Sequence, residues 1–285
     1  MHIIVGVDDS PTGLTALRWA LRIAGRAGAT VEAVRSWAYQ PLPMQPLASI
    51  EEMDHATAQG LAATVAAIAA ETDGDVEITT TVVRGPARHA LLALVEERHP
   101  SLVVVGRRSG HERTAPRALG SVSRRLVDAA SCPVAVVSHD PGDEAVAPVI
   151  MVALDGSAHA ERALRWATDL AQRTGGSLVL TQVVGMLGGA EEMAEVTVEA
   201  DAMLAEAAKA PSELGIGVTT AVGFGDPRRE LERVAEEHAV DLIVIGPRGL
   251  GGIAKLVTGS VATHLADHAE PGVIVVPSGT DRAAG

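Results

Sequence analysis

The sequence predicts an α/β protein built from two tandem domains, each with an open, parallel sheet of five strands. Three observations lead to this prediction. Short motifs recur in the same order in the two halves of the 285-residue chain. In each half, apolar runs of strand length alternate with segments of helical periodicity. These runs are continuous, as expected for strands whose two faces are both covered by helices.

Four pairs of motifs make up the repeat. ALRWA occupies residues 16–20 and again residues 163–167. Asp8 precedes the first copy by the same number of residues as Asp155 precedes the second. LVVVG at 102–106 is matched by LIVIG at 242–246. GSVSRRL at 120–126 is matched by GSVATHL at 259–265. Because the order is kept, chance is a poor explanation and a duplicated architecture is expected.

The elements of the first half follow one another in strict alternation. Strands are predicted at residues 2–8, 30–37, 76–83, 101–106 and 133–138. Helices are predicted between them, at residues 12–27, 50–71, 87–99 and 121–130. Within the first helix, Ala16, Trp19 and Ala20 can share one face, whereas Leu17 and Trp19 cannot. ALRWA is therefore interpreted as a stripe that faces the core rather than as a ligand site.

The second half repeats this alternation. Strands are predicted at residues 149–154, 177–184, 216–222, 241–246 and 272–277. Helices are predicted at residues 158–174, 190–210, 227–238 and 260–269. The stretch DPGDEAVAP at 140–148 contains Pro, Gly and acids with little periodicity, and it predicts a linker. We therefore expect one domain over residues 1–140 and a second over residues 146–285.

Composition excludes several classes of protein. The formal net charge of −13 repels polyanions and argues against binding of DNA or RNA. Cys132 is the only cysteine, so no disulfide can form within the chain. The N-terminus enters a strand pattern at once, unlike a signal peptide, and the longest apolar stretch, residues 61–70, is too short to cross a bilayer. We expect a cytoplasmic protein that does not associate with membranes.

The loop after the fourth strand of the second half reads GPRGLGGIAKLVTGS, residues 246–260. In an open parallel sheet, ligands bind beyond the carboxyl ends of the strands, where this loop is expected to lie. Gly246, Gly249 and Gly259 allow the backbone to approach a ligand closely. Ser260 opens a helix whose free N–H groups suit phosphate oxygens, so the loop predicts an anion site.

An acidic residue follows the first strand of each half and is expected at the same edge of the sheet. Asp8 and Asp155 occupy these positions and could accept hydrogen bonds from ribose hydroxyls. Together with the glycine loop, they describe a nucleotide site. The alternative is structural, with the glycines as turn residues and the serine as an N-cap.

Charge favours the nucleotide interpretation. The loop of the second half holds Arg248 and Lys255 and no acid. A cationic loop on an acidic chain suits a small polyanion such as a triphosphate, although a solvated charged loop is the alternative. In the first half, residues 106–125 hold a single acid, Glu112, against Arg107, Arg108, Arg113, Arg117, Arg124 and Arg125.

Taken together, these motifs resemble those of the universal stress protein family, over nearly the whole chain as two tandem family domains. Nucleotide-binding members carry G-x-x-G, nine residues, then G-[ST], which Gly246, Gly249, Gly259 and Ser260 match completely. VGVDDS at 5–10 and VALDGS at 152–157 look like the family's first strand, and SCPVAVV at 131–137 looks like its last strand. The resemblance implies Rossmann-like, adenine nucleotide alpha hydrolase-like domains of strand order 3-2-1-4-5.

The resemblance also implies ATP as the ligand, one per domain, with or without Mg²⁺. The acid after the first strand would hold ribose, the backbone at the end of the second strand would meet adenine, and the glycine loop and helix start would hold phosphates. The implied contacts in the first half are Gly6, Val7, Asp8, Ser36, Val105, Gly106, Gly110, Gly120, Ser121, Val122 and Ser123. Those in the second half are Ala153, Leu154, Asp155, Val183, Ile245, Gly246, Arg248, Gly249, Gly259, Ser260, Val261 and Ala262.

The first half departs from the family motif at one point. Gly106 and Gly110 are separated by three residues rather than two, while Gly120 and Ser121 keep their spacing. The added residue either lengthens the loop harmlessly or misplaces the phosphates. Asp8 and the nearby arginines favour retained binding, so both halves are predicted to bind, and the second half matches the motif more completely.

Other motifs are weaker. GLGGIA at 249–254 mimics a dinucleotide fingerprint but follows the fourth strand instead of the first. A P-loop is excluded because both lysines follow alanine. His264 and His268 lie four residues apart near Asp267 and could hold a metal, but unligated surface histidines are favoured. Cys132 is interpreted as a small buried residue rather than a nucleophile.

Two classes of function remain. The favoured one is a nucleotide-binding regulator whose ATP-bound state alters its association with itself or with a partner. The alternative is an enzyme, either a slow ATPase or an adenylyl-transfer enzyme on the same fold. No general base and no phosphate-clamping lysine is obvious beside the glycine loop, although His159 lies near the first strand of the second half.

The family resemblance adds expectations about role and assembly. It implies a part in survival under stress such as hypoxia, starvation or dormancy. It also implies pairing through the last strand of each domain, with the two halves of one chain forming a pseudo-dimer. A homodimer of chains is a further expectation.

Overall fold

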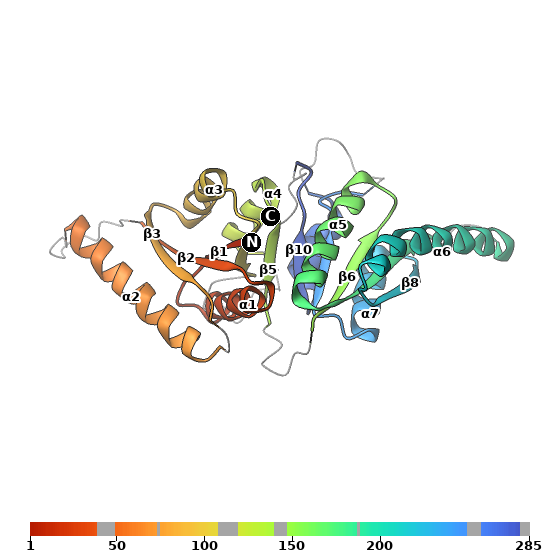
Figure 1. Cartoon of the computed structure of the whole chain (residues 1–285). Helices are drawn as coiled ribbons and strands as arrows, with labels where there is room; N and C mark the ends of the chain where they lie inside the picture. Colours follow the sequence, from red (N-terminus) through yellow and green to blue (C-terminus); the bar gives the residue numbers. More distant parts are fainter. Residues whose placement is uncertain are drawn as a thin grey trace. The chain divides into compact units, whose positions relative to one another are not determined.

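The computed structural model describes residues 1–38, 49–72, 75–107, 119–139, 147–186, 189–249 and 258–279. It divides the chain into two compact units, Met1–Asp140 and Pro141–Gly285 (Figure 1). We call them unit 1 and unit 2. The predicted linker lies largely outside the described residues, because these stop at 139 and resume at 147.

Unit 1 alternates strands and helices as the sequence predicts. Its strands are β1 (His2–Gly6), β2 (Thr30–Trp37), β3 (Ile78–Arg84), β4 (Leu102–Gly106) and β5 (Val134–Val137). Its helices are α1 (Pro11–Ala27), α2 (Ile50–Ala70), α3 (Ala87–Arg98) and α4 (Ser121–Ala129). Neighbouring strands are parallel in the order β3-β2-β1-β4-β5, which confirms the predicted order 3-2-1-4-5.

Unit 2 has the same architecture. Its strands are β6 (Val149–Leu154), β7 (Ser177–Val184), β8 (Val218–Phe224), β9 (Leu242–Ile245) and β10 (Gly272–Val275). Its helices are α5 (Ala158–Thr174), α6 (Ala190–Glu213), α7 (Pro227–Glu237) and α8 (Ser260–His268). The parallel order β8-β7-β6-β9-β10 is again 3-2-1-4-5.

The first strand of each unit lies at the switch point of its sheet. In unit 1, Ile3 of β1 pairs with Val31 of β2 on one side and Leu102 of β4 on the other. In unit 2, β6 likewise lies between β7 and β9. The connections leave these strands in opposite directions, which opens a crevice beyond their carboxyl ends. This crevice is where the sequence places both candidate sites.

The ALRWA motif packs into the core in both units, as predicted. Ala16, Trp19 and Ala20 of α1 are buried, and so are the corresponding residues of α5. Leu17 is also fully buried, which the single-face interpretation did not predict. The reason is that α1 packs against α2 as well as against the sheet, so a wider arc of this helix is covered.

Element boundaries agree with the prediction to within a few residues. The largest difference among the helices is α6, which was predicted to end at 210, before Pro211, and continues to Glu213. Pro211 lies in the last turn, and its carbonyl accepts from the N–H of Ile216 at 3.1 Å. Neither α6 nor any other helix in the described ranges is long and apolar enough to cross a membrane.

Candidate functional site

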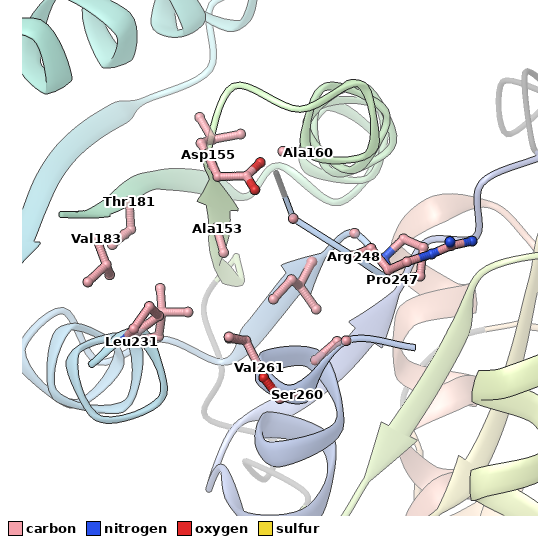
Figure 2. Close-up of a pocket in the computed structure, with 17 residues that line it drawn as sticks. Ala153, Asp155, Ala160, Thr181, Val183, Leu231, Pro247, Arg248, Ser260 and Val261 are labelled. Carbon is pink, nitrogen blue, oxygen red and sulfur yellow. The ribbon is translucent and has the colours of Figure 1, made fainter. Parts of the chain in front are cut away.

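A cavity of about 470 Å³ lies at the carboxyl ends of β6, β7 and β9 in unit 2. Figure 2 shows Asp155 on one side of it and the first residues of α8 on the other. Its size falls within the range of small-molecule sites, roughly 300–1,000 Å³. The lining residues are Ala153, Leu154, Asp155, Ala160, Thr181, Val183, Pro227, Leu231, Ile245, Gly246, Pro247, Arg248, Gly249, Gly259, Ser260, Val261 and Ala262.

Asp155 follows β6 directly and is half-buried. Its Oδ1 atom accepts a hydrogen bond from the backbone N–H of Ser157 at 3.0 Å, which ties the carboxylate to the start of α5. Its Oδ2 atom lies toward the loop after β9, since a Cβ atom added to Gly249 would be only 2.3 Å away from it. Any side chain at position 249 would therefore displace the carboxylate, so the close approach requires glycine.

The start of α8 presents backbone donors to the same cavity. Gly259 is the N-cap residue and offers no side-chain cap. The N–H groups of the first helical turn, Ser260 to Ala262, have no acceptor within a helix of this geometry. The N–H of Gly259 donates to the carbonyl of Pro247 at 2.6 Å, which anchors the end of the loop. The helix start therefore combines open donors with the positive end of a helix dipole, the arrangement that binds anions.

The remaining side of the cavity is largely apolar. Thr181 and Val183 of β7 lie next to each other there, with Leu231 of α7 nearby (Figure 2). Thr181 is fully buried, and its hydroxyl has no hydrogen-bond partner among the described residues. An apolar slot of this kind suits a flat ring system.

The described basic residues of the two predicted loops differ in position. The Arg248 side chain extends away from Asp155 (Figure 2). Arg124 and Arg125 are exposed on α4, and Arg107 is buried. The other charged residues of the two predicted loops, Arg108, Glu112, Arg113, Arg117 and Lys255, lie outside the described residues.

His159 lies close to the unit 2 cavity but is not one of its lining residues. Its ring Nδ1 is 2.6 Å from the Arg162 guanidinium. Burial lowers the pKa of His159, and the positive charges of Arg162 and Arg248 lower it further. The imidazole is therefore mainly neutral at pH 7 and directed at its own helix.

Unit 1 has a smaller cavity, about 180 Å³, at the equivalent place. It is lined by Gly6, Val7, Asp8, Thr12, Gly13, Val34, Ser36, Ala87, Leu91, Val105, Gly106 and Val122. Asp8 is exposed, and its carboxylate accepts hydrogen bonds from the backbone N–H of Ser10 at 3.1 Å and from the Ser10 hydroxyl. Thus the acid of unit 1 is turned back onto its own helix start.

The structure gathers most of the predicted site residues. Every contact residue implied for unit 2 lines its cavity. In unit 1, Gly120, Ser121 and Ser123 are not among the lining residues, and Gly110 lies outside the described residues. The Ser123 hydroxyl is buried and donates to the carbonyl of Arg107 at 3.0 Å, so it supports the loop from within.

Gly106 and Gly246 have a packing role that their sequence motifs do not predict. A Cβ atom on Gly106 would lie 2.8 Å from the Thr12 backbone, and one on Gly246 would lie 2.9 Å from the His159 Cβ atom. These glycines let the first helix of each unit approach the end of the fourth strand. The backbone of these glycines therefore approaches a neighbouring helix, and this packing shapes the crevice.

Several lining residues were not predicted, and most of them come from equivalent positions in the two units; Thr12 and Pro247 have no lining counterpart. Extending the internal repeat along the first helix, the second strand and the third helix would have found the others. In unit 1 they are Thr12, Gly13, Val34, Ala87 and Leu91. In unit 2 they are Ala160, Thr181, Pro227, Leu231 and Pro247.

The other candidate groups stand apart from both cavities. Burial raises the pKa of the Cys132 thiol to about 12, so it is not a nucleophile at neutral pH. The rings of His264 and His268 stack with centroids 4.5 Å apart, and His264 Nε2 lies 3.2 Å from Glu232. Within the described ranges, no three His, Cys, Asp or Glu side chains gather as a metal site would require.

The fold and the crevices define a tandem, doubly wound α/β protein with a cavity at the carboxyl ends of the strands in each unit, of ligand size in unit 2. The model of the universal stress protein family matches residues 1–138 and 148–277. The chain therefore belongs to the universal stress protein family, with two tandem family domains.

Similar proteins agree with this assignment. Universal stress protein Rv2623 of Mycobacterium tuberculosis (strain H37Rv) is 32% identical over 294 residues, covering 96% of each chain. Universal stress protein Rv1996 of the same strain is 29% identical over 305 residues, covering 96% of this chain and 94% of its own. The crystal structure of a universal stress protein from Archaeoglobus fulgidus has a TM-score of 0.69 at 21% identity, over 99% of this chain and 97% of that chain. At this identity, the structural likeness supports the fold.

Proposed function

We propose that this protein binds ATP in the unit 2 cavity and acts as a nucleotide-dependent regulator of a stress response or of dormancy. One observation carries the proposal: Asp155, Gly249 and the uncapped start of α8 surround a single cavity of about 470 Å³. A carboxylate and a row of backbone donors face the same space, as a ligand with both hydroxyl and phosphate groups requires.

Each part of ATP has a matching surface in this cavity. The Asp155 carboxylate would accept hydrogen bonds from ribose hydroxyls. The N–H groups of Ser260, Val261 and Ala262 would bind phosphate oxygens. The apolar slot beside Val183 would hold the adenine ring. Mg²⁺ would be held mainly by the phosphates, as is usual for this ion.

Binding without rapid turnover is the favoured form of the proposal. Among the described lining residues, Asp155 and Arg248 are the only charged ones, and Arg248 extends away from the acid. A pair of groups placed to exchange protons with an attacking water is therefore not seen in the described part of this cavity. Multiple turnovers of Mg-ATP by purified protein would instead favour the alternative, a slow ATPase or adenylyl-transfer enzyme.

Replacement of Gly249 tests the site directly. In Gly249→Val the new side chain would occupy the space of the Asp155 carboxylate, because the Cβ position is 2.3 Å from Oδ2. We expect a loss of ATP affinity of about 1–3 kcal/mol, the scale of a lost charge-assisted hydrogen bond, measured by isothermal titration calorimetry.

Gly217→Ala is the matched control, because its Cβ atom would make an ordinary 3.7 Å contact with Ser177 away from the cavity. This variant should bind ATP as the parent does. Unchanged affinity in Gly249→Val would remove the proposed site from unit 2.

Assembly forms part of the same proposal. The two units of one chain are proposed to pair as a pseudo-dimer, and two chains to form a homodimer whose stability depends on bound ATP. Sedimentation equilibrium with and without ATP measures this association. The cytoplasmic location stays a prediction from the sequence.

A further inference from the structure

The turn after the first strand differs between the two units in a correlated way. It reads VDDSPTG in unit 1 and LDGSAHA in unit 2. Asp9 of unit 1 occupies the place of Gly156 in unit 2. Gly13 of unit 1 occupies the place of Ala160. Each unit thus has one glycine in this turn where the other has a side chain.

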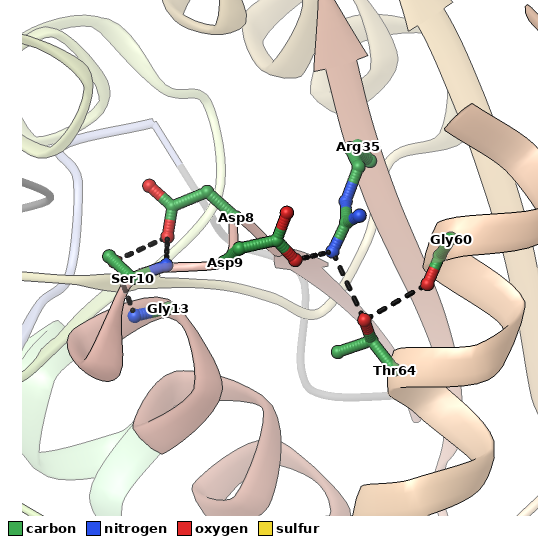
Figure 3. A network of polar contacts seen from close by, with 7 residues as sticks. All are labelled: Asp8, Asp9, Ser10, Gly13, Arg35, Gly60 and Thr64. Carbon is green, nitrogen blue, oxygen red and sulfur yellow. Dashed lines mark hydrogen bonds and ion pairs between the residues drawn. The ribbon is translucent and has the colours of Figure 1, made fainter. Parts of the chain in front are cut away.

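In unit 1 the turn after β1 packs closely against Gly13 in the first turn of α1. A Cβ atom added to Gly13 would lie 2.1 Å from Asp8 Oδ1, 2.8 Å from the Asp8 carbonyl oxygen and 3.0 Å from its backbone nitrogen. The Asp8 carboxylate fills this space and accepts hydrogen bonds from the N–H and hydroxyl of Ser10 (Figure 3). The Ser10 hydroxyl in turn accepts from the Gly13 N–H at 3.1 Å. Only glycine leaves room for this arrangement.

In unit 2 the turn takes another path. Gly156 has a φ of 78°, in the left-handed region that glycine adopts without strain. Ala160 is then accommodated as a buried residue at 4% exposure. The Asp155 carboxylate reaches the space above Gly249 while Oδ1 still accepts from the Ser157 N–H. The acid of unit 2 therefore faces the loop after the fourth strand.

An ion pair lies on the other side of the unit 1 turn, with the Asp9 side chain 78% exposed. The Asp9 carboxylate lies 2.7 Å from the Arg35 guanidinium, and it points away from Asp8 (Figure 3). Arg35 also donates to the Thr64 hydroxyl of α2 at 3.4 Å, and its side chain is 13% exposed. Asp9 is not among the described residues with positive φ, so it does not take the backbone conformation of its unit 2 counterpart. Gln182 replaces Arg35 in unit 2.

We infer that Gly13 and the Asp9–Arg35 pair are positioning residues that hold Asp8 against α1 and so weaken nucleotide binding in unit 1. This inference rests on the proposed function. Unit 2, with Gly156 and Ala160, is the high-affinity site, and unit 1 is a low-affinity site that fills at higher ATP concentration. The smaller unit 1 cavity, about 180 Å³ against about 470 Å³, agrees with this order.

The test converts the unit 1 turn into that of unit 2. Both changes, Asp9→Gly and Gly13→Ala, are needed, because alanine at 13 alone would strike the Asp8 backbone. They are made in Gly249→Val, where unit 2 binding is weakened, so that the difference in ATP binding from Gly249→Val alone reports unit 1. We expect unit 1 affinity to rise by about tenfold or more, the factor equal to one charge-assisted hydrogen bond. A crystal structure of the ligand-free variant should show Asp8 released from the Ser10 hydroxyl.

The reciprocal variant, Gly156→Asp with Ala160→Gly in the parent chain, is the matched control and should lower unit 2 affinity. Thermal unfolding checks that each variant is folded. Asp8 still bonded to the Ser10 hydroxyl in the ligand-free crystal overturns the positioning role. Asp8 released with unchanged unit 1 affinity overturns its effect on binding. If the parent chain binds no ATP, the proposed function is wrong and so is the proposed difference in affinity. The ligand-free crystal structure then still tests whether Gly13 and the Asp9–Arg35 pair position Asp8.

Discussion

Thr181 and Val34 occupy equivalent buried positions on the second strands of the two units, yet one carries a hydroxyl. The Thr181 hydroxyl finds no partner among the described residues, and a buried, unsatisfied polar group costs about 1–3 kcal/mol. Thr181→Val keeps the shape and removes this cost. We expect the free energy of unfolding of the ligand-free protein to rise by about 1 kcal/mol, measured by calorimetry.

Thr81 is a threonine whose hydroxyl, unlike that of Thr181, has a hydrogen-bond partner among the described residues. Its hydroxyl donates to Glu32 Oε1 at 2.6 Å, and Glu32 is buried at 6% exposure. Thr81→Val would leave that carboxylate with one fewer donor, so it should lower stability. A fall in stability for both variants would mean that the Thr181 hydroxyl is hydrogen-bonded in the folded protein.

At the scale of elements, α7 begins with a charged cap that its counterpart α3 lacks. Asp226 accepts hydrogen bonds from the backbone N–H and the guanidinium of Arg228, each at 3.0 Å. The Arg228 side chain is the main reason why the pKa of Asp226 falls from 3.8 to about 2. In unit 1 the N-cap is Pro86, which makes no side-chain hydrogen bond.

This cap predicts a pH dependence of unit 2. Because the folded-state pKa is lower than the unfolded one, the stabilisation is complete above about pH 4 and is lost as pH falls toward 2. Asp226→Asn keeps an N-cap acceptor but cannot titrate. The difference in unfolding temperature between wild type and variant should therefore shrink over this range. A constant difference would show that the ionised carboxylate adds no stability.

The elements themselves were predictable because their signals are local. Ser10 and Ser157 cap the first helix of each unit, and Gly28 and Gly175 end it in the left-handed conformation. Continuous runs such as LVVV and LIVI became fully buried strands. Helix α6 was expected to end before Pro211, but it continues to Glu213, because a proline in the last turn does not stop the helix at once.

At the scale of the whole molecule, the two units are expected to unfold separately, since each has its own core. ATP at 100 times its dissociation constant should stabilise unit 2 by about 2.7 kcal/mol. We therefore expect the calorimetric transition of unit 2 to move to higher temperature at ATP concentrations that leave unit 1 unchanged. Gly249→Val should reduce the shift, and equal shifts of both transitions would contradict unequal sites.

The sequence alone predicted the tandem α/β architecture, because periodicity, caps and repeated motifs act over a few residues and recur in both halves. The resemblance to the universal stress protein family added the strand order and most of the residues that line the unit 2 cavity. The sequence also located an acid beside each crevice, at Asp8 and Asp155.

Only the tertiary structure decided which way each acid points. Asp8 lies against Gly13 of α1, whereas Asp155 lies toward Gly249, and we attribute this difference to Gly13 and Ala160. The structure also assigned Gly106 and Gly246 to helix packing. These outcomes depend on distances between atoms that the chain brings together only on folding.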